Sequence, residues 1–310
     1  MIIRLEKWRF PASNGEGDIF ARAWLCAKPA AIVQIAHGMS EHSARYDEFA
    51  RFLCGHGFSV VANDHAGHGH SSQGHLGSFA SKAGGFDFAV RDLDSLFAIA
   101  EEKSGALPPL PRILFGHSMG SSLAALYAER FGGLAALALC GMPAAIKSSR
   151  LFQLIADFIC VFRGPLAKSP LLERLTGSVA NLPLEEKMRE RQWLTRDTEK
   201  VREFSTDPLC GFDYTAGGYQ TMLHAYHYLY SDKWGGKIPD IPILLVAGED
   251  DTASDTGKGP AGYAARLADT GHTHVDLKLF PGCRHEIVNE TNREEVFAFL
   301  LDWFKSKLPE

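Results

Sequence analysis

The sequence lacks a long uninterrupted apolar run. The nearest approach, Leu151 to Leu166, is broken by Asp157 and Arg163, whereas a membrane-spanning helix needs about 18 or more apolar residues. The first ten residues also lack the unbroken apolar stretch of a secretory signal, because they include Arg4, Glu6, Lys7 and Arg9. We therefore expect no membrane-spanning segment and a cytoplasmic protein.

Paired cysteines and basic clusters are absent as well. The six cysteines of the 310-residue chain are scattered without paired spacing, which predicts free thiols in a reducing compartment. The net charge is -5 and no block of like charge appears. Nucleic acid is therefore excluded as a partner, because phosphate binding needs clustered Lys and Arg.

Apolar runs rich in β-branched residues alternate with stretches of helical period, as in a mostly parallel sheet flanked by helices. Helical spacing is clearest around Phe49 and Leu53, around Leu96 and Ala100, and in the C-terminal segment from Val296 to Phe304. The predicted strands are Ala31 to Ala36, Phe58 to Asn63, Arg112 to Gly116, Leu134 to Cys140, Ile243 to Gly248 and Val275 to Phe280. The fold class is therefore α/β.

The alternation stops between about Met142 and Gly236, where helical apolar stretches mix with prolines and glycines. It resumes after Ile238. We predict a core made of residues 1–141 and 237–310, with a helical cap inserted at 142–236. The chain shows no internal repeat.

The strongest local motif is Gly116-His117-Ser118-Met119-Gly120. It follows a predicted strand and precedes a helix, the context in which two glycines hold a serine hydroxyl exposed above a sheet. Ser118 is therefore the predicted nucleophile. The alternative is a tight turn whose serine only caps the helix. It would not account for the histidine and the aspartates that follow predicted strands later in the chain.

A serine nucleophile needs a base and a carboxylate that orients it. Of thirteen histidines, His285 lies just past the last predicted strand and is the predicted base. Three aspartates follow the preceding strand, namely Asp250, Asp251 and Asp255. The order serine, acid, histidine is the one that this kind of hydrolase uses.

Acyl transfer also needs backbone N–H donors for an oxyanion. Met119, directly after the nucleophile, supplies one. The turn Ala36-His37-Gly38-Met39 after the first predicted strand supplies the other through the N–H of Met39, because Gly38 allows the backbone to approach closely.

The histidine-rich run from Asn63 to Ser71 suggests a metal site at first sight. Zinc enzymes, however, need three ligands of fixed geometry, and no His-Glu pair stands at helical spacing here. We predict a tight structural loop and no metal.

Together these motifs give the chain a family resemblance. It resembles the monoglyceride lipase and lysophospholipase group of α/β-hydrolases, which overlaps families labelled serine aminopeptidase. The residues that carry the resemblance are His37-Gly38-Met39-Ser40-Glu41-His42-Ser43, Arg45-Tyr46, Asp64-His65, Gly67-His68-Gly69, Ser71, Gly116 to Gly120, Arg284-His285-Glu286 and Asn289-Glu290.

The resemblance implies an α/β-hydrolase fold and selects Asp251, the fourth residue of the stretch that begins at Gly248, as the acid. Thr252-Ala253 follow it where the family often has Pro-Val, and Asp250 is the reserve candidate. The implied activity is cleavage of monoacylglycerol or lysophospholipid-type esters without a metal or organic cofactor.

In the family the insertion is a lid that lines an acyl pocket and touches lipid surfaces. By resemblance, the acyl-binding residues are Phe152, Ile155, Phe158 and Ile159, and the cap makes transient membrane contact. The same stretch could instead be ordinary core facing the main domain, because buried and exposed apolar faces look alike in sequence.

Three other functions are compatible with the sequence. An aminopeptidase or amidase would use the same residues and an acidic anchor for a free amine, for which the cap offers Glu185, Glu186 and Asp207. A non-catalytic small-molecule binding protein of this fold would usually lack a triad member. A cofactor-free peroxidase would share the triad. The sequence gives no indication of the oligomeric state.

Overall fold

The structure is a computed structural model that describes residues 3–79, 85–145, 149–175, 182–231 and 233–308. Its centre is an eight-stranded sheet in the order β1-β2-β4-β3-β5-β6-β7-β8. The six strands from β4 to β8 in that order run parallel to one another. They are β3 (Ala31–Ala36), β4 (Phe58–Asn63), β5 (Arg112–His117), β6 (Ala136–Cys140), β7 (Ile243–Gly248) and β8 (Val275–Phe280). The predicted α/β fold is confirmed.

The N-terminal edge of the sheet is an antiparallel hairpin that the sequence analysis did not predict. It consists of β1 (Arg4–Pro11) and β2 (Asp18–Leu25), and β2 pairs antiparallel with β4. β1 alternates exposed and buried residues towards its end, with Trp8 and Phe10 buried. Charged residues on the exposed side suit an edge strand, and they hide the apolar signal.

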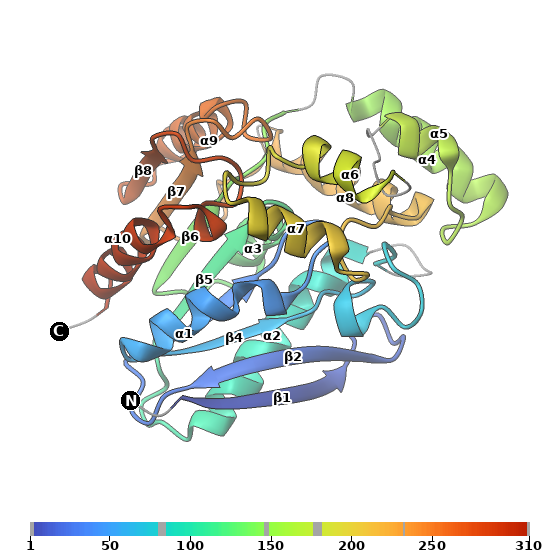
Figure 1. Cartoon of the computed structure of the whole chain (residues 1–310). Coiled ribbons are helices and arrows are strands. Elements are labelled where there is room, and N and C mark those ends of the chain that lie inside the picture. The colour runs from blue at the N-terminus through green and yellow to red at the C-terminus, as the bar shows by residue number, and fades with distance from the viewer. Residues whose placement is uncertain (1–2, 80–84, 146–148, 176–181, 232, 309–310) are drawn as a thin grey trace.

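Helices cover both faces of the sheet (Figure 1). On one face, α1 (Asp47–Gly55) and α10 (Arg293–Ser306) share a buried apolar cluster with side chains of the central strands. On the other, a second cluster joins the sheet to α2 (Gly85–Ser104), α3 (Met119–Arg130) and α9 (Lys258–Asp269). Burial on both faces explains why the inner parallel strands appear in sequence as nearly continuous apolar runs, whereas β8 at the edge is only partly buried.

The described residues between Met142 and Gly236 contain helices and no strand. The helices are α4 (Ser149–Arg163), α5 (Pro170–Leu175), α6 (Leu184–Glu190), α7 (Thr198–Thr206) and α8 (Ala216–Leu229). α4 packs against α8, and Figure 1 draws α4 and α5 at the margin of the molecule. The division into core and cap remains a prediction. Short 3₁₀ helices occur at Ser43–Tyr46, Gly69–Ser71 and Ile287–Asn289.

No helix within the described ranges has both the length and the apolar character needed to cross a bilayer.

Candidate active site

Ser118 occupies a tight turn between β5 and α3. Its φ of 53° and ψ of -119° lie in a backbone region that residues with a side chain rarely adopt, a form of strain that is found at functional sites. The turn needs both neighbouring glycines, because a Cβ at Gly116 would lie 2.3 Å from Gly120 O and one at Gly120 would lie 2.0 Å from Ala36 O. The geometry lifts a partly exposed Ser118 side chain above the end of the sheet.

His285 and Asp251 form a buried pair. Nδ1 of His285 lies 2.9 Å from Oδ1 of Asp251, and the two residues are 2% and 0% exposed. Asp250 is exposed instead, and its N–H bonds to Cys283 O. Of the three candidate aspartates, the structure brings Asp251 to the imidazole.

The charge of Asp251 is favoured despite its burial. Burial alone would raise the pKa of this carboxyl group, but the neighbouring His285 and hydrogen bonds from Ser254 and Ala253 hold it below its usual value. Oδ2 of Asp251 is buried and has no partner among the described residues. An ionised Asp251 fixes His285 with Nδ1 protonated, which leaves Nε2 free to accept a proton.

The loops of Ser118 and His285 meet at one rim of the sheet. The N–H of Ser118 bonds to Cys140 O at 2.8 Å, and a Cβ on the next residue, Gly141, would lie 3.2 Å from Cε1 of His285. Within the described residues no hydrogen bond of up to 3.5 Å joins Ser118 Oγ to His285 Nε2. Such bonds are often long before substrate binds.

The turn after β3 lies against Ser118. A Cβ on Gly38 would be 3.3 Å from Cβ of Ser118. In the described chain, neither the N–H of Met39 nor that of Met119 donates a hydrogen bond to protein. Two unused donors next to a serine side chain are what an oxyanion hole requires, although their role in catalysis stays a prediction.

The histidine-rich run forms a loop tied to backbone and side chains. Asp64 accepts the N–H groups of Ser43 and His70 at 2.9 and 2.8 Å. His68 contacts Ala66 O and the hydroxyl of Tyr214. Burial lowers the pKa of His68 to about 4, so its ring is neutral near pH 7. These contacts fit the predicted structural loop.

The segment before α7 covers His285 and was missed by the sequence analysis. The N–H groups of His285 and Glu286 bond to Trp193 O and Leu194 O at 3.4 and 2.7 Å. The Trp193 ring centroid lies 5.1 Å from that of His285. Trp193 belongs to no sequence motif. Only its contact with His285, 92 residues later in the chain, places it at the site.

The four predicted acyl-binding residues fall on different faces of α4. Ile159 is 9% exposed, and Ile155 packs with it on the buried face. Phe158 is 63% exposed, with its ring 4.4 Å from that of Phe162. Phe152 is half-buried. The exposed face of α4 carries Leu151, Leu154, Phe158, Val161 and Phe162.

One cluster in the described part of the chain has metal-binding atoms close together. The ligand atoms of His42, Asp207 and Cys210 lie within 4.8 Å of one another. The guanidinium group of Arg191 interacts electrostatically with Cys210, and its positive charge opposes binding of a cation there.

Comparison with known proteins places these features in context. Residues 27–292 match the model of a family described as serine aminopeptidase, S33. The monoacylglycerol lipase of Mycolicibacterium smegmatis is 28% identical over 90% of each chain. The monoglyceride lipase of Mus musculus is 36% identical over 63% of this chain and 58% of its own. A thermostable carboxyl esterase from Bacillus coagulans superposes with a TM-score of 0.87 at 28% identity, covering 98% of this chain and 99% of the esterase.

Proposed function

This chain belongs to the serine aminopeptidase S33 family of α/β-hydrolases, and we propose that it cleaves monoacylglycerol or lysophospholipid-type esters through an acyl-enzyme on Ser118. Its lipase relatives and esterase neighbours show that the chain is a carboxylic ester hydrolase. The substrate and the catalytic serine are the proposed part.

One observation carries the proposal. His285 and Asp251 form a buried pair at 2.9 Å, beside the strained turn that exposes Ser118. A neutral imidazole with Nδ1 held by an ionised carboxylate is the arrangement that accepts a proton from a serine hydroxyl.

In the proposed reaction His285 Nε2 takes the proton from Ser118 Oγ as this oxygen attacks the ester carbonyl carbon. The N–H groups of Met39 and Met119 stabilise the carbonyl oxygen as it becomes negative. The C–O bond to the alcohol breaks, and the alcohol leaves with the proton from His285. Water then attacks the acyl-enzyme, gives its proton to His285 and releases the acid as Ser118 recovers its hydroxyl.

A lipid substrate is supported by the surface of α4. Five large apolar side chains on that helix are each at least 60% exposed, although such side chains usually avoid water. We assign this face to transient contact with a lipid surface by a cytoplasmic enzyme. Ile155 and Ile159, on the buried face, remain proposed acyl contacts.

An aminopeptidase or amidase is the second candidate, because the family model carries that name. A free amine would need an acidic anchor. Glu185 is exposed and Glu186 is half-buried, and Asp207 already pairs with His42 at 2.9 Å. The ester reading therefore has the stronger structural support.

The test is a substrate panel of monoacylglycerols, lysophospholipids, short aryl esters and aminoacyl amides, with Ser118→Ala as the control. We expect turnover of the lipid esters by the wild type, and loss of turnover and of fluorophosphonate labelling in the variant. Persistent labelling would reject Ser118. Preference for aminoacyl amides would reject the lipid substrate but not the nucleophile, and absence of any hydrolysis would favour a binding protein.

A further inference from the structure

We propose that Glu41 is a positioning residue that aims the oxyanion-binding turn at Ser118. The inference rests on the proposed function, because it assumes that the N–H of Met39 faces the reacting oxygen. It goes further because Glu41 is buried, with 2% of its surface exposed. We infer that this carboxylate affects the transition state without touching the reacting atoms.

Glu41 is surrounded by donors. Oε1 accepts the N–H of Gly38 at 2.5 Å and the hydroxyl of Tyr46 at 2.7 Å, and Oε2 accepts Nη1 of Arg45 at 2.5 Å. Nδ1 of His117 lies 3.4 Å from Oε1. Because donors face both oxygens, a carboxylate satisfies the site and a carboxamide would turn its NH₂ group towards a donor.

The next peptide of the turn is fixed from the other side. Nε2 of His37 accepts the N–H of His65 at 3.0 Å, so Nδ1 carries the proton and donates to Gly38 O at 2.8 Å. Burial lowers the pKa of His37 to about 3, which keeps this neutral form. In a trans peptide the N–H points opposite to the C=O. Holding Gly38 O therefore sets the direction of the Met39 N–H.

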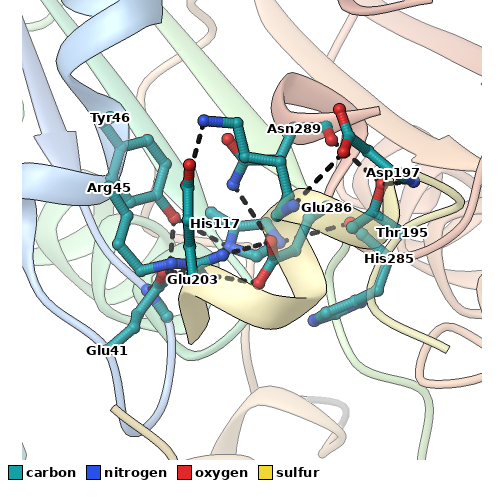
Figure 2. A network of polar contacts seen from close by, with 12 residues as sticks. Glu41, Arg45, Tyr46, His117, Thr195, Asp197, Glu203, His285, Glu286 and Asn289 are labelled. Carbon is teal, nitrogen blue, oxygen red and sulfur yellow. Dashed lines mark hydrogen bonds and ion pairs between the residues drawn. The ribbon is translucent and has the colours of Figure 1, made fainter. Parts of the chain in front are cut away.

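Glu41 is itself held by a buried network (Figure 2). Arg45 bridges it to Glu286, on which the guanidinium makes contacts of 2.7 and 2.6 Å. Tyr46 uses its proton on Glu41, so Nδ1 of His117, 2.8 Å from the Tyr46 oxygen, donates to it. Nε2 of His117 lies 3.2 Å from the carbonyl oxygen of His285 and must donate as well.

Two donating nitrogens make His117 an imidazolium. Burial alone would lower the pKa of His117, but hydrogen bonding to Glu41 and the charges of Glu41 and Glu286 raise it above its usual value. The network then holds two positive and two negative charges. Burying an uncompensated charge would cost several kcal/mol, whereas this balanced set of four can be kept away from water.

The network thus joins the three loops of the site. Glu41 holds the oxyanion turn, His117 directly precedes Ser118, and Glu286 directly follows His285. A buried ion network stabilises a fold less than apolar packing would. It does, however, fix the directions of hydrogen-bond donors, which apolar contacts leave free. Fixed donor directions are what stabilise developing charge.

The test compares Glu41→Gln with Glu290→Gln. Glu290 is equally buried, pairs with Arg196 at 2.9 Å and accepts the N–H of Arg284, but has no contact with Gly38. The readouts are kcat and KM for p-nitrophenyl butyrate, inhibition by an alkyl trifluoromethyl ketone and by its matched methyl ketone, and the urea midpoint. The fluorinated ketone forms an oxyanion with the serine, and the methyl ketone reports ground-state binding.

For Glu41→Gln we expect kcat to fall about 10- to 100-fold with KM little changed. Affinity for the trifluoromethyl ketone should fall by a similar factor, and affinity for the methyl ketone should stay. Glu290→Gln should keep the wild-type ratio of the two affinities even if its urea midpoint falls. Should Glu41→Gln not fold, Glu41→Asp withdraws the carboxylate by about 1.5 Å and should show the same loss of selectivity.

A wild-type affinity ratio in a folded Glu41 variant would reject the positioning role, even if its stability is reduced. The same conclusion follows if Glu290→Gln loses the ratio to the same extent. Ser118→Ala separates the two proposals: if that variant is inactive, rejection concerns Glu41 alone, and if it retains turnover, both proposals fail.

Discussion

A Cβ placed on Gly38 would lie only 3.3 Å from Cβ of Ser118 and 2.7 Å from Oε1 of Glu41. Gly38 therefore occupies the space between the proposed nucleophile and the carboxylate that holds the turn. The glycine is required for room, since its φ is not among the positive values. The oxyanion turn and the serine turn form one packed unit.

Gly38→Ala is expected to displace the turn, because the new Cβ would lie 2.7 Å from Oε1 of Glu41, a distance shorter than real Cβ contacts. We expect kcat for p-nitrophenyl butyrate to fall about 100-fold, the effect of losing one oxyanion donor. Steady-state kinetics measure it. Gly55→Ala is a control, because a Cβ at that helix end would meet nothing within 4 Å; a wild-type kcat in Gly38→Ala would contradict the packing argument.

Asp251→Asn is expected to lower kcat by about four orders of magnitude, because an amide cannot hold His285 in the required tautomer. Asp250→Asn should leave kcat close to the wild-type value, since Asp250 is exposed and bonds through its backbone. Kinetics on the same ester decide between them. A large loss in Asp250→Asn with an active Asp251→Asn would reverse the assignment of the acid.

The sequence predicted all six parallel strands, including the partly exposed edge strand β8, and the pattern is clearest where a strand is buried on both faces. β7, for example, is entirely buried, and such a strand appears in sequence as a continuous apolar run. β1 was missed because its exposed positions are charged, and β2 was missed although it is largely buried, because Asp18 and Arg22 interrupt its apolar residues.

The site was predicted unevenly for a similar reason. Ser118 and its turn are local, so glycine spacing identifies them. The role of Glu41 could not be predicted, because Ser40-Glu41-His42-Ser43 looks like a polar surface turn and Arg45 finds its partner Glu286 across 241 residues. On α4 both faces are apolar, so the sequence could not separate exposed Phe158 from buried Ile159.

The exposed face of α4 is expected to matter only for substrates in a lipid phase. In the double variant Leu154→Gln, Phe158→Gln we expect turnover of monoacylglycerol in phosphatidylcholine vesicles to fall about 10-fold or more, because burial of each such side chain in lipid contributes about 1.5–3 kcal/mol. Turnover of dissolved p-nitrophenyl butyrate should not change. Vesicle flotation measures the loss of binding directly.

The control for that experiment is Leu5→Gln, because Leu5 is 51% exposed and lies on the edge strand β1, at one end of the sheet order. Its vesicle binding should equal that of the wild type. Equal loss in both variants would indicate nonspecific adsorption. An unchanged double variant would remove α4 from the lipid contact.

The buried histidines near the oxyanion turn are expected to make the protein sensitive to mild acid. Burial lowers the pKa of His37 to about 3 and of His68 to about 4, and holds the pKa of His65 well below its usual value. The unfolded chain takes up these protons near pH 6.5. Unfolding therefore binds protons below about pH 6.5, and stability falls as pH decreases towards 4.

The slope can be measured and assigned. Each proton contributes about 1.4 kcal/mol per pH unit to the free energy of unfolding. Three such histidines would therefore give about 4 kcal/mol per unit between pH 6 and 5, reduced to about 3 because the folded protein takes up an opposing proton on Asp92, whose pKa burial raises to about 6. His117 adds nothing there, because its raised pKa leaves it protonated in both states. Urea denaturation at pH 7, 6 and 5 gives the slope, and His68→Gln should lower it by about one proton whatever its effect on stability at pH 7. A flat free energy of unfolding from pH 7 to 5 would show that these rings take up protons in the folded protein.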